Sequence, residues 1–317
     1  MKPDPEPSAE AHRPVLRDEV VAALCAERAA PDASYVDATF GRGGHARALL
    51  DVLPPGAKLL VLDRDPQAIE AALALAATDH RVRVVRGRFG AIAELVALAG
   101  IGDVAGVLID LGVSSPQLDD PARGFSFRAD GPLDMRMDPD SGESAAAWLA
   151  RADETELARV FATYGEERFA RRIARAITQR RRQRPIVRTL DLADIVEASQ
   201  PRRDPQKHAA TRVFQAIRIH VNDELNELTQ ALEGALTVLS IGGRLAVIAF
   251  HSLEDRIVKR TFALWSRGPD VPRRIPLAGK PQVRARPVGK PVRASAAEVR
   301  ANARARSATL RVVEKVA

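Results

Sequence analysis

The chain has 317 residues, of which 46% are hydrophobic and 28% are charged, and its net charge is +7 at pH 7. This length fits about two domains, and the composition is that of a folded protein rather than a disordered one. The single cysteine, Cys25, excludes an internal disulfide and a cysteine-based metal cage. The amino-terminal stretch is proline-rich and charged where a signal peptide needs an apolar core, and no run approaches the ~18 apolar residues of a membrane span. We therefore expect a cytoplasmic protein.

The positive charge of the chain is concentrated in two segments. Residues 168–188 contain nine arginines and no acidic residue, and residues 267–317 contain 13 lysines or arginines against three acids. Clustered arginines suit the phosphates of a nucleic acid, because a guanidinium can bind a phosphate through two hydrogen bonds. Two plainer explanations stay open, namely a solvated charged face and the arginine-rich composition that a GC-rich genome produces.

The first third of the chain alternates short apolar runs with helical stretches. Strands are expected at residues 35–38, 58–63, 82–85 and 104–111, and helices at 44–53, 66–77 and 91–99. Strands that alternate with helices are joined by right-handed crossovers, which produce a parallel, doubly wound α/β sheet.

The pattern changes after Leu111. Residues 114–140 are rich in turn formers, and 145–198 are mostly helical in pattern. A long amphipathic helix at 221–240, an apolar strand at 244–250, a helix at 253–265 and a final edge strand at 307–313 follow. The simplest organisation is one α/β domain with an insertion. Its first part is 1–116, the inserted helical, substrate-binding subdomain is 117–211, and its second part, with the basic carboxyl-terminal segment, is 212–317.

Three of the expected strands end in a carboxylate. Asp37, Asp63 and Asp110 close the first, second and fourth strands, and the carboxyl ends of parallel strands meet at the edge where such sheets bind ligands. A glycine-rich turn follows the first strand, and Asp63 lies 22 residues after Gly41. This is near the spacing of about 20 residues at which an acid binds ribose hydroxyls. A cofactor that contains a nucleoside is therefore expected.

The charge of this region favours one such cofactor. NAD and ATP carry phosphates, which need a G-x-G-x-x-G loop or a P-loop, and the turn Gly41-Arg42-Gly43-Gly44-His45 has neither pattern. S-adenosylmethionine has no phosphate and carries a sulfonium cation, which three converging carboxylates attract. A methyltransferase is therefore favoured over a dehydrogenase, although a glycine turn also occurs where close packing alone requires it.

Several longer strings carry a family resemblance. They include VDATFGRGGH (36–45), LDRDPQAI (62–69), DLGVSSPQLDDPARGFSF (110–127), TRVFQAIRIHVNDEL (211–225) and GGRLAVIAFHSLEDRIVK (242–259). Together they closely resemble the RsmH family, also called MraW, over about residues 12–315. These are bacterial S-adenosylmethionine-dependent enzymes that methylate the N4 amine of a decoding-centre cytidine in 16S ribosomal RNA.

The resemblance implies a fold, a cofactor and a partner. The fold is a Rossmann-like class I methyltransferase with a doubly wound sheet and an inserted helical subdomain. The cofactor is S-adenosyl-L-methionine, and the partner is 16S ribosomal RNA in the small ribosomal subunit, with no membrane; a homodimer stays open. Methylation of another RNA or of DNA, and an assembly factor without turnover, are the alternatives. Intact Gly43, Asp63 and Asp110 argue against the last of these.

The resemblance also implies which residues contact the cofactor. They are Gly43, Gly44, His45, Asp63, Phe89, Asp110 and Gln117. Glycines let the backbone approach the methionine part, Asp63 can accept both ribose hydroxyls, and the Phe89 ring can cover an adenine face. The alternatives are that Phe89 only fills the core, that His45 contributes only its backbone at a helix start, and that Asp63 is only a helix N-cap.

The chemistry of an exocyclic amine needs no covalent intermediate. Methylation of a ring carbon would need a cysteine thiolate, and Cys25 lies on an expected helix before the first strand, away from this edge. The enzyme must instead hold the amine with hydrogen-bond acceptors in line with the methyl group. We expect Asp110 as the catalytic acceptor, or a main-chain carbonyl of residues 114–116, where the segment Ser114 to Gln117 lacks the aromatic residue of other amino-methyltransferases.

The remaining candidates have simpler interpretations. His251 is expected to be a capping or packing residue, and Asp134 and Asp138 to be turn and salt-bridge residues, so we assign no metal. The inserted subdomain carries the first arginine cluster, and we interpret it as the RNA-binding part of the chain. The alternative is a packing subdomain whose arginines face water.

Overall fold

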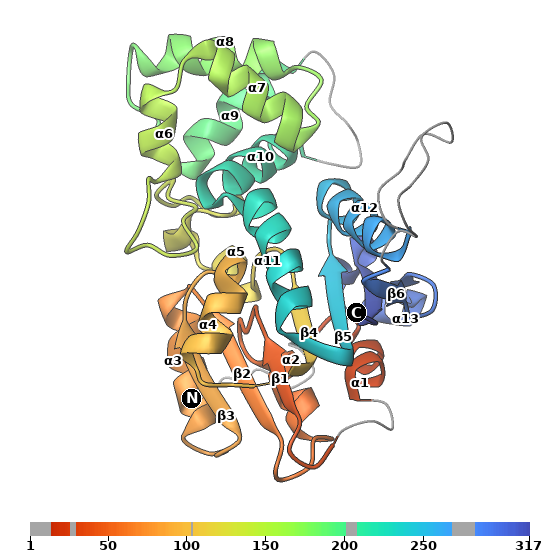
Figure 1. The fold of residues 1–317 in the computed structure, drawn as a ribbon. Helices are drawn as coiled ribbons and strands as arrows, with labels where there is room; N and C mark the ends of the chain where they lie inside the picture. The colour runs from red at the N-terminus through yellow and green to blue at the C-terminus, as the bar shows by residue number, and fades with distance from the viewer. Residues whose placement is uncertain (1–13, 26–29, 103, 201–207, 268–282) are drawn as a thin grey trace, which may run out of the picture. The chain divides into compact units, whose positions relative to one another are not determined.

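The computed structural model describes residues 14–25, 30–102, 104–200, 208–267 and 283–317. The chain divides into two compact units, one made of Met1–Gly112 with Asn226–Ala317 and the other of Val113–Leu225 (Figure 1). Each unit has its own hydrophobic core. Among the described residues, no helix combines the length and the apolar character that a membrane span requires.

A single mixed sheet forms the centre of the first unit. Its strands are β1 (Ser34–Asp37), β2 (Lys58–Asp63), β3 (Val82–Arg86), β4 (Val104–Asp110), β5 (Leu239–Ala249), β6 (Ala285–Pro287), β7 (Val292–Arg293) and β8 (Thr309–Lys315). They lie in the order β3-β2-β1-β4-β5-β8-β6, and β7 also pairs with β8. Strands β1 to β5 are parallel, whereas β8 is antiparallel to its neighbours. The chain order reverses between β1 and β4, where open α/β sheets bind their ligands.

Helices cover both faces of this sheet. They are α1 (Arg17–Cys25), α2 (Gly44–Leu50), α3 (Pro66–Ala76), α4 (Ile92–Leu98), α11 (Glu224–Val238), α12 (Ser252–Arg267) and α13 (Ala296–Ala301), with short 3-10 turns η2 (Phe89–Ala91) and η4 (Ala303–Ser307). Successive strand residues face opposite sides. Leu60 and Leu62 therefore pack with α4, α11 and α12, whereas Leu59 and Val61 pack with α1, α2 and α3. The expected doubly wound α/β architecture is confirmed.

Local sequence sets the beginning of α3. The Asp65 carboxylate accepts a hydrogen bond of 3.0 Å from the Gln67 N–H, and Pro66 occupies the first turn, where its missing N–H costs nothing. The expected helix at 66–77 is therefore found at nearly its predicted bounds.

A strand was expected at 307–313, and its predicted place at the edge of the sheet was wrong. The strand exists as β8, but it lies inside the sheet, between β5 on one side and β6 and β7 on the other. Local pattern shows that a segment is extended but does not show which strands flank it. The short strands β6 and β7 were not predicted, and they cover the side of β8 that faces away from β5.

The expected long helix at 221–240 is found as α11, which begins three residues later and ends two residues earlier than predicted. The chain forms α10 (Thr211–Asn222) and α11, which are separated by Asp223 in the left-handed conformation, with φ of 52°. Aspartate tolerates this conformation better than most residues. The following strand β5 begins at Leu239, five residues earlier than predicted, because an irregularity between its pairings with Val104 and Gly106 accommodates the extra residues.

The second unit is helical. It contains α5 (Ser115–Asp119), η3 (Pro121–Arg123), α6 (Ala145–Arg151), α7 (Glu154–Gly165), α8 (Ala170–Arg181), α9 (Thr189–Ser199) and α10. Its core includes Trp148 and Phe161 together with Phe214 and Ile217 of α10. Residues 212–225 therefore pack within the helical unit, whereas the expected boundary at residue 211 gave them to the sheet domain. A substrate-binding role for this unit stays a prediction.

Candidate functional site

The three carboxylates that the sequence singled out lie at one edge of the sheet. Asp37, Asp63 and Asp110 are the last residues of β1, β2 and β4, and these strands are parallel neighbours. Thr39, which follows β1, connects two of them, because its hydroxyl accepts a hydrogen bond of 2.7 Å from the Asp110 N–H and its own N–H donates to Asp37 at 3.1 Å. Sequence reasoning missed Thr39. Its place two residues after a strand-ending acid was the available signal.

The turn between β1 and α2 depends on glycine. Gly41 and Gly43 have φ of 57° and 73°, the left-handed region that side chains disfavour. A Cβ on Gly43 would lie 2.5 Å from the Phe40 ring, so no larger residue fits. The turn leads directly into α2, whose first residues are Gly44 and His45. Contact of this turn with the methionine part of the cofactor stays a prediction.

Asp63 fixes this turn to the neighbouring strand. One of its carboxylate oxygens, Oδ2, accepts from the Gly41 N–H at 2.8 Å, and the other, Oδ1, accepts from the Asp65 N–H at 2.9 Å. Burial raises the pKa of Asp63 above its ordinary value. The helix N-cap is Asp65, so Asp63 is not merely a cap. Each carboxylate oxygen has two lone pairs and can accept a further hydrogen bond, which is what binding of ribose hydroxyls requires.

The buried residues His45 and Asp37 form a polar cluster with the half-buried Asp110. His45 Nε2 lies 3.5 Å from Asp110 Oδ2. Burial lowers the pKa of His45, but the nearby negative charges of Asp110 and Asp37 raise it by more, so the net shift is upward. Burial also raises the pKa of Asp37 to about 7. The interpretation that His45 contributes only its backbone is therefore incomplete, because its ring faces Asp110.

This cluster contains polar atoms that are not satisfied by the described residues. Asp37 Oδ2, Asp110 Oδ1 and both ring nitrogens of His45 are buried without a hydrogen-bond partner in the described part of the chain. Buried polar groups in native proteins are normally paired. A cluster rich in acceptors and negative charge suits a cationic group, such as the ammonium or the sulfonium of S-adenosylmethionine. The residues present therefore fit this cofactor.

Phe89 and Gln117 stand apart from this cluster in different ways. Phe89 begins η2 after β3, and its half-buried ring packs against the core beside α4 and α11, so a contact with adenine stays a prediction. Gln117 belongs to the helical unit, where its side-chain oxygen accepts a 2.9 Å hydrogen bond from the Ser114 N–H at the start of α5. This capping contact gives Gln117 a structural role that the sequence did not predict.

The other candidates have local partners. His251 Nε2 lies 3.0 Å from Glu254, whose carboxylate also accepts from the Phe250 N–H at 2.8 Å, so His251 takes part in the start of α12. Asp134 forms a 2.8 Å ion pair with Arg136, as expected for a turn residue. Within the described ranges, no group of three His, Cys, Asp or Glu side chains is arranged to hold a metal.

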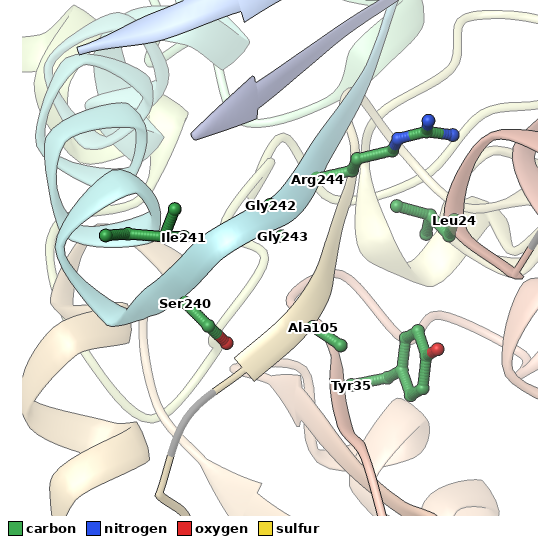
Figure 2. A pocket seen from close by; sticks show the side chains of 8 residues that line it. All are labelled: Leu24, Tyr35, Ala105, Ser240, Ile241, Gly242, Gly243 and Arg244. Carbon is green, nitrogen blue, oxygen red and sulfur yellow. The ribbon is translucent and has the colours of Figure 1, made fainter. Parts of the chain in front are cut away.

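A cavity of about 260 Å³ lies elsewhere in the first unit (Figure 2). It is lined by Leu24, Tyr35, Ala105 and residues 240–244. Tyr35 and Ala105 are the second residues of β1 and β4, so this cavity lies at the amino ends of the strands. The strand-ending carboxylates lie at the opposite edge, and the cavity is therefore not the predicted cofactor site.

The sheet order, the glycine turn and the strand-ending acids define a Rossmann-like methyltransferase. Residues 9–316 match the MraW methylase family, and the chain belongs to that family. The predicted resemblance is thereby confirmed, together with the methyltransferase class and S-adenosylmethionine as its cofactor.

Similar proteins carry a consistent name. Two relatives, from Xanthomonas axonopodis pv. citri (strain 306) and Xanthomonas euvesicatoria pv. vesicatoria (strain 85-10), are called "Ribosomal RNA small subunit methyltransferase H". Each is 53% identical to this chain over 306 residues, which is 96% of the chain and 88% or 89% of the relative. The solved structure of a putative rRNA methylase from Clostridium thermocellum is 12% identical, with 95% of each chain covered and a TM-score of 0.42.

Proposed function

We propose that this protein transfers a methyl group from S-adenosylmethionine to the N4 amine of a decoding-centre cytidine in 16S ribosomal RNA. The observation that carries this proposal is the 53% identity, over nearly the whole chain, to proteins named as small-subunit ribosomal RNA methyltransferases. The family resemblance narrows the target to the N4 amine. A cytoplasmic location agrees with such a substrate, and a homodimer stays an expectation.

The sheet edge would hold the cofactor through several different contacts. The backbone of the Gly41–Gly44 turn and His45 would bind the methionine part, and Asp63 would accept the ribose hydroxyls. The ring of Phe89 would lie beside the adenine, and Gln117 would contribute from the segment that follows β4. S-adenosylmethionine supplies a methyl group activated by its sulfonium. The protein would contribute by positioning the cofactor and the target amine and by electrostatic stabilisation.

Asp110 is the proposed acceptor for the target amine. The lone pair of N4 is delocalised into the cytosine ring, so an acceptor that binds an amine hydrogen makes the nitrogen a better nucleophile. Asp110 ends β4 with one oxygen facing His45 and the other without a described partner, which supports this role. A main-chain carbonyl of residues 114–116 is the alternative.

The structure also agrees with direct transfer rather than a thiolate mechanism. Cys25 is the last residue of α1, on the amino-terminal side of β1, and burial raises the pKa of its thiol to about 11. At neutral pH such a thiol stays protonated, and the thiolate is the nucleophilic form. Cys25 is therefore unsuited to attack a cytosine ring.

The helical unit is the proposed RNA-binding part, and the structure divides its arginines into two groups. One group stabilises the unit itself. Arg181 donates hydrogen bonds of 2.6 Å to the carbonyls of Leu149 and Ala152, and Arg184 and Arg188 form ion pairs with Asp191 and Asp130. These arginines are already engaged, so they are poor candidates for phosphate contacts.

The second group faces solvent along α8. Ile173, Ala174 and Ile177 bury the opposite side of this helix. Arg171, Arg172 and Arg182, here termed the outer α8 arginines, are exposed and form no ion pair among the described residues. Arg171 and Arg182 are about three helical turns, or roughly 16 Å, apart on the same side. A basic row of this length supports contacts with successive phosphates of an RNA backbone.

The proposed function is tested by nucleoside mass spectrometry of 16S ribosomal RNA. RNA from cells that lack this gene should lose N4-methylated cytidine, and the wild-type gene should restore it. The Asp110→Asn variant should restore less. Unchanged N4-methylcytidine in the deletion strain would refute the target, and loss of a different methylated nucleoside would identify another substrate.

A further inference from the structure

The turn that carries Phe89 is fixed at both of its ends. At its start, the Gly87 N–H donates to the Asp63 carbonyl at 2.9 Å, so the turn leaves β3 beside the proposed ribose-binding residue. At its end, the Gly90 N–H donates at 3.0 Å to the carboxylate of Glu227, which lies on α11. Phe89 lies between these two hydrogen-bonded glycines.

Glu227 makes a second contact with the same turn. Its other carboxylate oxygen accepts a hydrogen bond of 3.1 Å from the Arg88 guanidinium. The Glu227 side chain is 7% exposed, whereas that of Arg88 is 49% exposed. A buried carboxylate is costly unless it is paired and hydrogen-bonded, and both of its oxygens here are used on residues that flank Phe89.

The fit between Glu227 and the turn is close. A Cβ on Gly90 would lie 2.6 Å from Glu227 Oε2 and 3.0 Å from Gln230 Oε1, so only glycine allows the carboxylate to reach the backbone. The attachment of α11 to the sheet does not need Glu227, because Leu228, Leu232 and other apolar residues of this helix are buried in the core. The contacts of Glu227 with residues 88–90 therefore serve a purpose other than attaching α11 to the sheet.

We propose that Glu227 is a positioning residue for cofactor binding, which holds residues 88–90 so that Phe89 meets the adenine. This inference rests on the adenine contact in the proposed function. It assigns part of the affinity for the adenine of the cofactor to a carboxylate on α11, distant in sequence from the glycine turn and from Asp63. Glu227 itself touches no reacting atom.

The test measures binding of S-adenosylhomocysteine by calorimetry in the absence of RNA. Glu227→Ala should weaken binding about tenfold, and Glu227→Gln, which keeps an acceptor for the Gly90 N–H, should restore most of it. Gly90→Ala disturbs the same contact from the other side and should also weaken binding, which keeps the test decisive if Glu227→Ala does not fold. In turnover assays the KM for S-adenosylmethionine should rise while kcat and the KM for RNA change little.

A matched control lies on the same helix. Glu233 accepts hydrogen bonds from Trp265 at 3.0 Å and from Arg284 at 3.0 Å, so Glu233→Ala removes structural contacts of α11 without touching the turn. It should lower stability and leave cofactor affinity unchanged. An equal loss of affinity in Glu233→Ala would show that Glu227 acts only through general packing.

A double-mutant cycle with Phe89→Ala tests the route of the effect. If Glu227 acts by placing Phe89, the two substitutions should be strongly non-additive in binding affinity. Additive effects, or normal binding by a folded Glu227→Ala variant, would overturn the inference. Because no RNA is present, failure of the proposed RNA target would leave these binding results unaffected, so the two failures are distinguishable.

Discussion

Replacement of Asp63 gives the sharpest test of the cofactor site. Asp63→Ala removes the carboxylate that would accept two ribose hydroxyls, and loss of two charge-assisted hydrogen bonds costs about 1.5 to 3 kcal/mol. Binding of S-adenosylhomocysteine should therefore weaken roughly 10- to 150-fold. Calorimetry on the purified variant measures this change directly.

The structure adds a second effect of the same substitution. Asp63 also accepts from the N–H groups of Gly41 and Asp65, so the alanine variant leaves two backbone donors without their partner. Each lost hydrogen bond costs about 1 kcal/mol of unfolding free energy. Asp63→Asn keeps one oxygen for the backbone but lacks the charge, so it should be the more stable variant and still bind the cofactor weakly.

The neighbouring Asp65 supplies the control. It caps α3 through the Gln67 N–H, and Asp65→Ala should lower the unfolding free energy by about 1 kcal/mol without weakening the cofactor complex. Wild-type affinity in a folded Asp63→Ala protein would refute the ribose assignment. An equal loss of affinity in Asp65→Ala would attribute the effect to general disturbance of this loop.

Three further predictions follow from side chains described above. Cys25→Ser should retain nearly full methyl transfer, because the thiol is protonated at neutral pH; loss of turnover in a folded variant would contradict direct transfer. Changing the outer α8 arginines to Gln should flatten the dependence of RNA affinity on salt by up to ~0.7 to 0.9 in log-log slope per lost contact, measured by filter binding. The control Arg181→Gln should instead lower stability, and an unchanged slope in the triple variant would make α8 a solvated face. Burial raises the pKa of Asp37 from 3.8 to about 7, so between these pH values the folded chain keeps a proton that the unfolded chain loses. This contribution to stability therefore falls as pH rises through the window. In urea titrations, the free energy of unfolding of the wild type should decrease with pH more steeply than that of Asp37→Asn, by up to about 1.4 kcal/mol per pH unit.

The meeting of Asp37, Asp63 and Asp110 at one edge of the sheet was predictable because its signals are local. Each acid ends an apolar run, and a parallel sheet brings the ends of neighbouring strands together whatever the rest of the chain does. The glycine turn follows β1 directly, and the spacing of Gly41 and Asp63 agrees with the hydrogen bond that joins them. The contacts that cross between distant segments were not predictable, and Glu227 is the clearest example, because it meets Gly90 across 137 residues of sequence.

The sequence also could not show which arginines stabilise the fold and which are exposed. The run of arginines at residues 168–188 predicts a basic segment. It does not distinguish Arg181, which donates to carbonyls inside the helical unit, from the exposed Arg171. The same holds in the carboxyl-terminal segment. Arg284 pairs with Glu233 and lies over the Trp265 ring at 5.8 Å, so it stabilises the fold. Part of the basic segment, residues 268–282, lies outside the described residues.

The inner position of β8 has a consequence for how the protein is made. This strand consists of residues 309–315, which are synthesised after those of β5, β6 and β7, yet all three of these strands pair with it. One side of β5 therefore lacks its native partner until residues 309–315 have been translated, and an unpaired strand edge favours aggregation. We expect that a premature stop codon before residue 309 would leave a chain that cannot complete its sheet, because β5, β6 and β7 would all lack their common partner.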